Sequence, residues 1–336
     1  MNVLIYGAGA IGCHLAYCLS QSGHNVDLLT RGEHYLTMKK NGMSIKICDN
    51  EKIIKKKVIK ENLKFKFIKN LTEIKGKHFD YIFITIKLND YDEKTFRDIH
   101  PFLEKDTAVI PPCTKIPFWW LYNLKGNSNK KFNNIEIDPQ ASKYFKGKNI
   151  IGMTMWLSSV LQNPGEIVVR HVQRGYPLKE IFPEMKNHAD RLRKSIEPSC
   201  ISPKVDNIKS ELYIKAINSL AFNMVALDTE FNNLQLKENK NSVITIKKIM
   251  QEGEQIPIKL NLPIFQSIDE RINQTLSSTA HTMSMLNDYK IGKKPELNHL
   301  WESFESLCKI IDTHMDFTES LYQKIVRKIY LKRNKQ

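Results

Sequence analysis

The stretch Asn2-Val-Leu-Ile-Tyr6 runs straight into Gly7-Ala8-Gly9-Ala10-Ile11-Gly12, and this stretch decides the fold of the first half of the chain. The apolar run predicts a buried strand, and residues 11–22 after the glycines predict a helix. Glycines spaced GxGxxG between a strand and a helix permit a tight turn, a close approach of the backbone to a pyrophosphate, and close helix–strand packing. We therefore expect all six residues of this turn to cradle a dinucleotide at the helix N-terminus; the alternative is a glycine-rich turn without a ligand.

Strands and helices alternate through the first half, which predicts a parallel sheet covered on both faces. Further strands are expected at 25–30, 81–87, 107–112, 149–157 and 166–172, with a helix at 187–195. Lysine alternates with apolar residues through 51–70, which is typical of a strand with one solvent-exposed face. From residue 206 the period becomes helical, at 207–227, 243–259, 266–279, 295–311 and 317–332. The predicted fold is an α/β Rossmann domain with a doubly wound parallel sheet, residues 1–205, followed by an all-helical domain, residues 206–336.

Composition argues against several functional classes. The net charge of +15 is carried almost wholly by lysine, whereas specific readers of nucleic acid rely on the bidentate geometry of arginine. No apolar run approaches the ~20 residues that cross a bilayer, and the start of the chain does not resemble a secretion signal. The six cysteines are scattered without metal-ligand spacing, and no histidine pairs with another as a metal ligand. We expect a cytoplasmic protein that binds neither nucleic acid, membrane nor metal.

The end of the second strand indicates which dinucleotide is bound. A site that prefers NAD carries an acidic residue there to grip the ribose 2′-hydroxyl, but this chain has Leu29-Thr30-Arg31. Arg31 can face a 2′-phosphate with its guanidinium group, and Lys87, at the end of the strand at 81–87, is a second cation. The alternative for each is a solvated surface cation, and Glu33 lies nearby. The pattern favours NADP(H).

Three segments of the second half carry a polar constellation. On a helix, Lys215, Ser219 and Asn223 fall within about 80° of one another, so they form one stripe among apolar neighbours. A polar stripe on a buried helix needs partners or a function. Ser284 and Glu296 stand in the other two segments. Glu296 opens a predicted helix, where its alternative role is a favourable interaction with the helix dipole.

With these residues in view, the chain resembles the ketopantoate reductase (2-dehydropantoate 2-reductase) family over about residues 1–320. The resemblance rests on the joint order and spacing of several motifs. They are GAGAIG, Arg31, Thr85-Ile86-Lys87, Pro164-Gly165, Glu211-Leu-x-x-Lys215 with Asn223, and Ser284-Met-Leu-Asn-Asp288 with Glu296.

The resemblance implies a Rossmann domain and a helical domain with the active site between them, where NADPH reduces a branched 2-oxo acid to a 2-hydroxy acid. Ketopantoate, reduced to pantoate for pantothenate biosynthesis, is the default substrate. Lys215 would donate a proton to the ketone oxygen, and Glu296 would orient that lysine. Asn223, Ser284, Ser219 and Thr114 would contact the substrate. A different 2-oxo acid or an imine as substrate, or a member of the family that binds NADP(H) without catalysis, stays open, as does a monomer or a homodimer.

The sequence departs from the family pattern in the expected pocket. Thr114-Lys115 stands where the family usually has Asn-Gly, and Ser219 stands where many relatives have asparagine. Threonine lacks the paired donor and acceptor of an amide. Lys179-Glu180 replaces a common Gly-Glu. Trp119 and Trp120 are expected either in the substrate wall or in the core.

Overall fold

A computed structural model describes residues 1–49, 52–87, 90–124, 143–277 and 282–333. The chain divides into two compact units. Unit 1 takes Met1–Cys113 and Glu136–Ile208, and unit 2 takes Thr114–Ile135 and Lys209–Gln336. The helical unit thus takes in the segment that begins at Thr114 as well as the C-terminal part of the chain.

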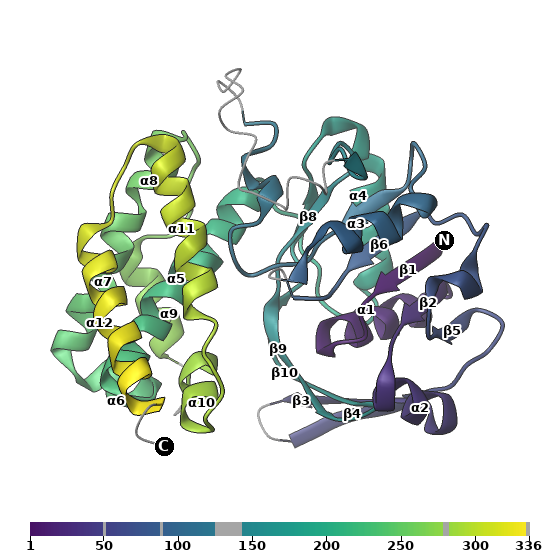
Figure 1. Ribbon diagram of the computed structural model, residues 1–336, viewed down its shortest axis with the longest axis horizontal. Helices are drawn as coiled ribbons and strands as arrows, with labels where there is room; N and C mark the ends of the chain where they lie inside the picture. The colour runs from purple at the N-terminus through teal and green to yellow at the C-terminus, as the bar shows by residue number, and fades with distance from the viewer. Residues whose placement is uncertain (50–51, 88–89, 125–142, 278–281, 334–336) are drawn as a thin grey trace. The chain divides into compact units, whose positions relative to one another are not determined.

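The main sheet of unit 1 has five strands in the order β5-β2-β1-β6-β7, and every neighbouring pair is parallel. The strands are β1 (Asn2–Tyr6), β2 (Asn25–Leu29), β5 (Phe65–Ile68), β6 (Tyr81–Ile84) and β7 (Ala108–Ile110). Parallel pairing brings the carboxyl ends of all five strands to one edge, where open α/β sheets bind their ligands. The order reverses at β1, next to the glycine turn. The predicted α/β fold is confirmed (Figure 1).

A second sheet in unit 1 has the order β4-β3-β10-β9 and forms the long curved ribbon of Figure 1. Its strands are β3 (Met43–Asp49), β4 (Lys52–Ile59), β9 (Trp156–Asn163) and β10 (Glu166–Gly175), and a small sheet pairs β8 (Ile151–Met153) with β11 (Leu178–Glu180). The strand expected at 149–157 is therefore two strands in two different sheets. The lysine-rich stretch also differs from expectation: β4 is exposed along most of its length and on both faces, whereas β5 is mostly buried.

Unit 1 contains the helices α1 (Ala10–Gln21), α2 (Gly32–Asn41), α3 (Glu93–Ile99) and α4 (Lys186–Ile196). Helix α1 packs on β1 and β2 and buries eight successive residues from Gly12 to Leu19. Such continuous burial requires neighbours on all sides, and α4, β9 and β10 supply them. The N-terminal turn is thereby attached to one of the most deeply buried helices of the unit.

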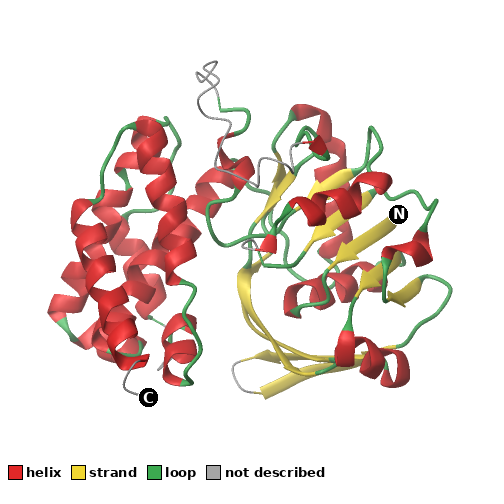
Figure 2. Cartoon of the chain, in the orientation of Figure 1, coloured by secondary structure: helices red, strands yellow, loops and turns green. Residues whose placement is uncertain are grey.

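Unit 2 is helical (Figure 2). Its helices are α5 (Ile208–Thr229), α6 (Asn233–Glu238), α7 (Lys240–Gly253), α8 (Gln255–Lys259), α9 (Ile268–Leu276), α10 (Ser284–Lys290), α11 (Leu297–Ile311) and α12 (Asp316–Arg333). The single helix expected at 243–259 breaks after Gly253, because Pro257 has no N–H and is tolerated only in the first turn of a new helix. Among the described helices, none is both long enough and apolar enough to cross a bilayer.

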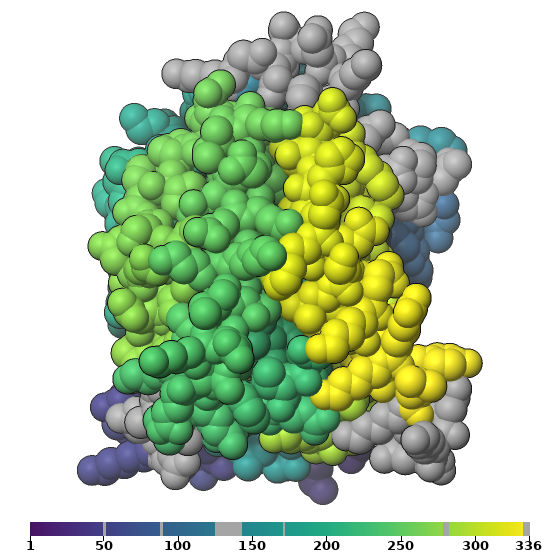
Figure 3. All heavy atoms as spheres, turned by 90° about the vertical axis from the view of Figure 1, so that its left-hand side faces the viewer, coloured from purple at the N-terminus to yellow at the C-terminus, as the bar shows by residue number. Residues whose placement is uncertain are grey.

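Helices α7 and α12 lie side by side on the face of unit 2 seen in Figure 3. Glu252 of α7 fixes the start of α12. Its carboxylate accepts hydrogen bonds from the backbone N–H groups of Phe317 and Thr318, both at 2.9 Å, and from the Thr318 hydroxyl at 2.6 Å. A carboxylate at a helix N-terminus satisfies free N–H groups and complements the helix dipole.

Candidate functional site

The glycine turn has the geometry that the sequence requires of it. Gly7 has φ +117°, a conformation that side chains with a Cβ rarely adopt. A Cβ on Gly12 would overlap the Gly7 carbonyl oxygen and crowd the Thr85 hydroxyl, so only glycine fits there. Gly9 is the N-cap of α1 and has no side chain to occupy the first-turn N–H groups. A helix N-terminus of this kind is suited to bind a phosphate.

The expected cations lie just beyond the strands that flank β1. Arg31 is exposed and is the N-cap residue of α2, two residues after the end of β2. Lys87 is exposed and follows β6 by three residues. Thr85, directly after β6, donates from its hydroxyl to the Gly7 carbonyl at 2.6 Å. The parallel sheet thus carries the turn and both cation-bearing segments at one edge.

One residue of this region was missed by sequence reasoning. His34, in the first turn of α2, is half-buried, with Nε2 2.8 Å from the Ala8 carbonyl oxygen and Nδ1 2.7 Å from the Gly165 nitrogen. Burial lowers the pKa of this histidine. No local pattern distinguishes it, because its partners lie in other elements of the fold.

In unit 2, helix α5 carries the polar stripe. Lys215 lies among buried apolar residues, and burial lowers the pKa of its ammonium group to about 8. The cause is desolvation, which disfavours the charged form. A lysine with this pKa is a much stronger acid than an ordinary lysine, and it remains mostly protonated at neutral pH.

The remainder of the stripe is hydrogen-bonded. The Asn223 amide group donates to the Ser219 carbonyl at 2.8 Å and to the Ser219 hydroxyl at 3.3 Å. The side-chain amide oxygen of Asn223, Oδ1, accepts a hydrogen bond from the Met285 backbone N–H at 3.2 Å. Asn223 therefore joins α5 to the first turn of α10, whose first residue is the exposed Ser284. The structure brings these three expected substrate residues into one neighbourhood.

Glu296 is the N-cap residue of α11 and forms an ion pair with Lys115. The Lys115 Nζ lies 3.3 Å from the Glu296 Oε2, and the two side chains are 12% and 31% exposed. The residue that replaces the glycine of the family pattern thus contacts the carboxylate expected to be catalytic. Thr114, the preceding residue, is half-buried.

The two tryptophans belong to the core. Trp119 and Trp120 lie in a short 3-10 helix, Phe118–Leu121, and both are fully buried. The Trp120 Nε1 donates to the Lys209 carbonyl at 2.9 Å, and its ring lies 5.6 Å from that of Tyr213. Lys209 donates in turn to the Tyr122 carbonyl, so this segment is tied to the start of α5.

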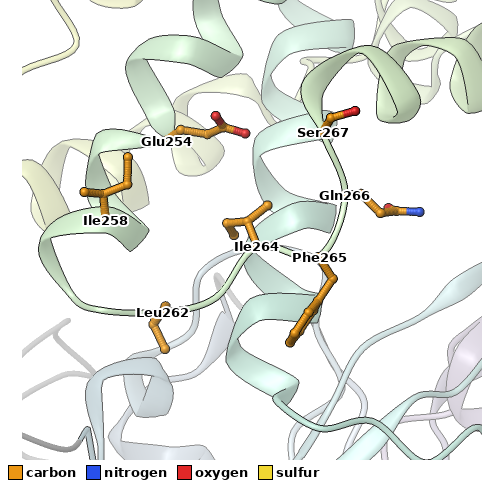
Figure 4. Close-up of a pocket in the computed structure, with 7 residues that line it drawn as sticks. All are labelled: Glu254, Ile258, Leu262, Ile264, Phe265, Gln266 and Ser267. Carbon is orange, nitrogen blue, oxygen red and sulfur yellow. The ribbon is translucent and has the colours of Figure 1, made fainter.

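A shallow hollow of about 330 Å³ lies elsewhere in unit 2, where α8 leads into α9 (Figure 4). Seven residues line it: Glu254, Ile258, Leu262, Ile264, Phe265, Gln266 and Ser267. It includes none of the residues expected to act in a site. His281, three residues before Ser284, lies outside the described residues.

Two family models match the chain, and together they span more than half of it. Residues 3–112 match the model described as "Ketopantoate reductase PanE/ApbA", and residues 207–328 match "Ketopantoate reductase PanE/ApbA C terminal". A 2-dehydropantoate 2-reductase of Mesorhizobium japonicum is 22% identical over 316 residues, covering 93% of each chain. One of Pyrococcus horikoshii is 26% identical over 317 residues, covering 93% of this chain and 92% of the relative.

Solved structures agree with this fold. The crystal structure of 2-dehydropantoate 2-reductase from Methylococcus capsulatus has a TM-score of 0.76 at 18% identity and covers 100% of this chain and 98% of its own. A D-mandelate dehydrogenase, solved with NADH and anilino(oxo)acetate, has a TM-score of 0.75 at 20% identity and covers 98% of both chains. The chain belongs to the ketopantoate reductase family of oxidoreductases.

Proposed function

We propose that this protein is an NADPH-dependent reductase that converts a branched 2-oxo acid to the 2-hydroxy acid, with ketopantoate as the substrate and pantoate as the product. The observation that carries this proposal is the polar stripe on α5, where half-buried Lys215 shares a helix face with the hydrogen-bonded Ser219 and Asn223. Partial burial lowers the pKa of Lys215 to about 8, which suits a proton donor at neutral pH. The names of the relatives support the same substrate. Scattered, unpaired cysteines suit the reducing cytoplasm, where pantothenate biosynthesis would use the product.

The glycine turn of unit 1 fits a dinucleotide, because its glycines are closely packed and the N-cap Gly9 has no side chain to cap the first-turn N–H groups of α1. Residues Gly7–Gly12 would hold the pyrophosphate, and Arg31 and Lys87 would face the 2′-phosphate of NADPH. When bound, the nicotinamide supplies a hydride to the ketone carbon. A D-mandelate dehydrogenase of similar fold has been solved with NADH, so the preference for the 2′-phosphate rests on Arg31 in place of an acidic residue.

Unit 2 would supply the residues that act on the substrate. As negative charge develops on the ketone oxygen, the Lys215 ammonium donates a proton to it, and low surrounding polarity makes that transfer easier. Glu296, which forms an ion pair with Lys115, would offset the positive charge of Lys215 and orient its ammonium group. Asn223, Ser219, Ser284 and Thr114 would hold the carboxylate and hydroxyl groups of the substrate, with Asn223 held in place by its bond to the Met285 N–H.

A second candidate is the reduction of a different 2-oxo acid. The Lys115–Glu296 ion pair favours it, because a lysine contacts the catalytic carboxylate where relatives have a glycine. An added cation and a longer side chain change both the charge and the space of a substrate site.

The test is a steady-state assay of the full chain with NADPH and NADH against a panel of 2-oxo acids that includes ketopantoate. We expect turnover of ketopantoate with NADPH. The Lys215→Met variant should lose at least about a hundredfold in kcat, the usual contribution of a general acid, while the Kd for NADPH changes less than twofold. Equal activity in that variant removes Lys215 from the mechanism.

The Arg31→Ala variant tests the cofactor within the same assay. Loss of a charge-assisted bond to the 2′-phosphate should raise the KM for NADPH about tenfold or more and leave that for NADH nearly unchanged. An unchanged ratio of the KM for NADPH to the KM for NADH would refute the preference for NADPH. Binding of NADPH without turnover of any 2-oxo acid would instead support a family member that has lost catalysis.

A further inference from the structure

We propose that His34 is a positioning residue of the dinucleotide site, which holds the Ala8–Gly9 peptide so that the Gly9 N–H faces the phosphates. The inference rests on the proposed binding of a dinucleotide at residues 7–12. It assigns a role to a side chain that lies outside the motifs by which the site is recognised.

The two hydrogen bonds of His34 fix its protonation state. A backbone N–H can only donate, so the Nδ1 that lies 2.7 Å from the Gly165 nitrogen must be an acceptor. The Nε2 must then carry the hydrogen and donate it to the Ala8 carbonyl oxygen, 2.8 Å away. Only the neutral imidazole in this one tautomer makes both bonds.

The bond to Ala8 determines where the next N–H points. Across a trans peptide, the carbonyl oxygen and the N–H of the following residue lie on opposite sides, and the described residues contain no cis peptide bond. The Ala8 oxygen accepts from His34 and also from the Cys13 thiol at 3.3 Å. With its oxygen held on that side, the peptide turns the Gly9 N–H toward the other side. Gly9 has no side chain to crowd this N–H, and it is the N-cap residue of α1, where a phosphate would bind.

His34 also connects the glycine turn to the second sheet. Gly165 lies in the turn between β9 and β10, and its carbonyl oxygen accepts from the Ser44 N–H at 2.8 Å at the start of β3. The Pro164-Gly165 motif therefore has a structural partner: it presents a fixed N–H that orients the imidazole. Since the imidazole in turn orients the Ala8–Gly9 peptide, the β9–β10 turn is part of what shapes the phosphate site.

Protonation of His34 would remove this arrangement. Imidazolium has two donors, so Nδ1 could no longer accept from Gly165. The titratable group that faces the ring among the described residues is the Cys13 thiol, 3.8 Å from Nε2, and burial raises the pKa of that thiol. The pKa of His34 is lowered by burial, against the Ala8 bond, which raises it. The neutral, positioning form is therefore complete above the ordinary histidine pKa of about 6.5 and is lost as the pH falls through the lower pKa of the folded protein.

The experiment measures dinucleotide affinity in matched variants of the full chain. We expect His34→Ala to raise the Kd for NADPH about tenfold at pH 7.5, the loss of roughly one net hydrogen bond, with little change in kcat at saturating NADPH. His34→Gln is the conservative rescue, because the amide has a donor and an acceptor at similar spacing and does not titrate. Its Kd should stay within about threefold of wild type.

Two controls separate positioning from folding and from the cofactor's own titration. Ile196→Ala removes a fully buried side chain of α4, beside the Ser195 carbonyl that accepts from the Ser22 hydroxyl at the opposite end of α1 from the glycine turn, so the melting temperature should fall while the Kd changes less than about twofold. The Kd for NADP⁺ is measured by calorimetry from pH 7.5 to 5. Titration of the 2′-phosphate affects every variant alike, so the wild type should weaken more than His34→Gln at the acid end.

The results decide between the proposals. If His34→Ala binds NADPH as tightly as wild type, or Ile196→Ala weakens binding as much as His34→Ala, the positioning role is refuted and the proposed function stands. If wild type binds neither NADPH nor NADH, both proposals fail.

Discussion

At the scale of residues, chemistry in this chain depends on the surroundings of a few charged and titratable side chains. Burial shifts the pKa of Lys215 to about 8, and the same cause acts on Lys209, six residues earlier on α5. Lys115 and Glu296 form an ion pair, and His34 is held neutral between two backbone groups. The spacing of Lys215, Ser219 and Asn223 predicts a shared stripe, and the bonds of Asn223 to Ser219 agree with it. No pattern in the neighbouring sequence predicts the Lys115–Glu296 ion pair or the hydrogen bonds of His34.

The pH dependence of reduction follows from Lys215. With the Lys215 ammonium as the proposed proton donor, kcat should be constant below pH 7 and fall as the pH rises through about 8, where this lysine loses its proton. A pH–rate profile at saturating substrate checks this. Because the pKa of Lys209 is also about 8, Lys209→Arg serves as the control: it keeps a donor for the Tyr122 carbonyl but does not titrate in this range. A profile that becomes flat in this variant would assign the titration to Lys209.

Lys115 should control substrate preference. Replacing it by glycine restores the usual family residue and releases Glu296 from its ion pair, so kcat/KM for ketopantoate relative to other 2-oxo acids should rise about tenfold, or ~1.4 kcal/mol in the transition state. Lys115→Met removes the charge while retaining most of the volume. If both variants shift the preference alike, charge is responsible; an unchanged preference in both shows that Lys115 does not select the substrate.

At the scale of elements, helix and strand ends depend on contacts that a local pattern shows only in part. The GxGxxG turn is predicted well because Gly7 and Gly12 meet steric demands within one strand–turn–helix unit. The strand expected at 149–157 is divided between two sheets, since β8 pairs with β11 and β9 pairs with β10. Pairing partners distant along the chain decide such boundaries, and apolar runs do not specify them.

Helix α12 offers an element-scale test. Glu252→Ala removes three hydrogen bonds accepted by one carboxylate at the N-terminus of α12, so we expect a loss of about 1–3 kcal/mol in the free energy of unfolding of the helical unit. Thermal unfolding followed by circular dichroism measures it. Gln251→Ala, an exposed neighbour on α7, should change stability by less than about 0.5 kcal/mol. Equal stability of the two variants would show that Glu252 does not hold the helix start.

At the scale of the whole molecule, the α/β class and the helical C-terminal half follow from the change of period near residue 206. The two compact units divide the chain differently, because the segment from Thr114 joins the helices. It does so through core contacts: Trp119 and Trp120 are fully buried, and Trp120 bonds to the Lys209 carbonyl. The sequence of this short segment, which has no helical period, does not predict that it joins the helical unit. Its burial depends on packing against helices that are distant in the sequence.

By itself the sequence determined what depends on near neighbours: the glycine turn, the α/β class, the stripe on α5 and the family. Only the tertiary structure decided which side chains meet across the chain. His34 reaches Gly165, 131 residues away, and Lys115 reaches Glu296. The physical reason is that steric and periodic constraints act within a few residues. A hydrogen bond or ion pair between distant segments instead requires the register and packing of every element between them to be fixed first.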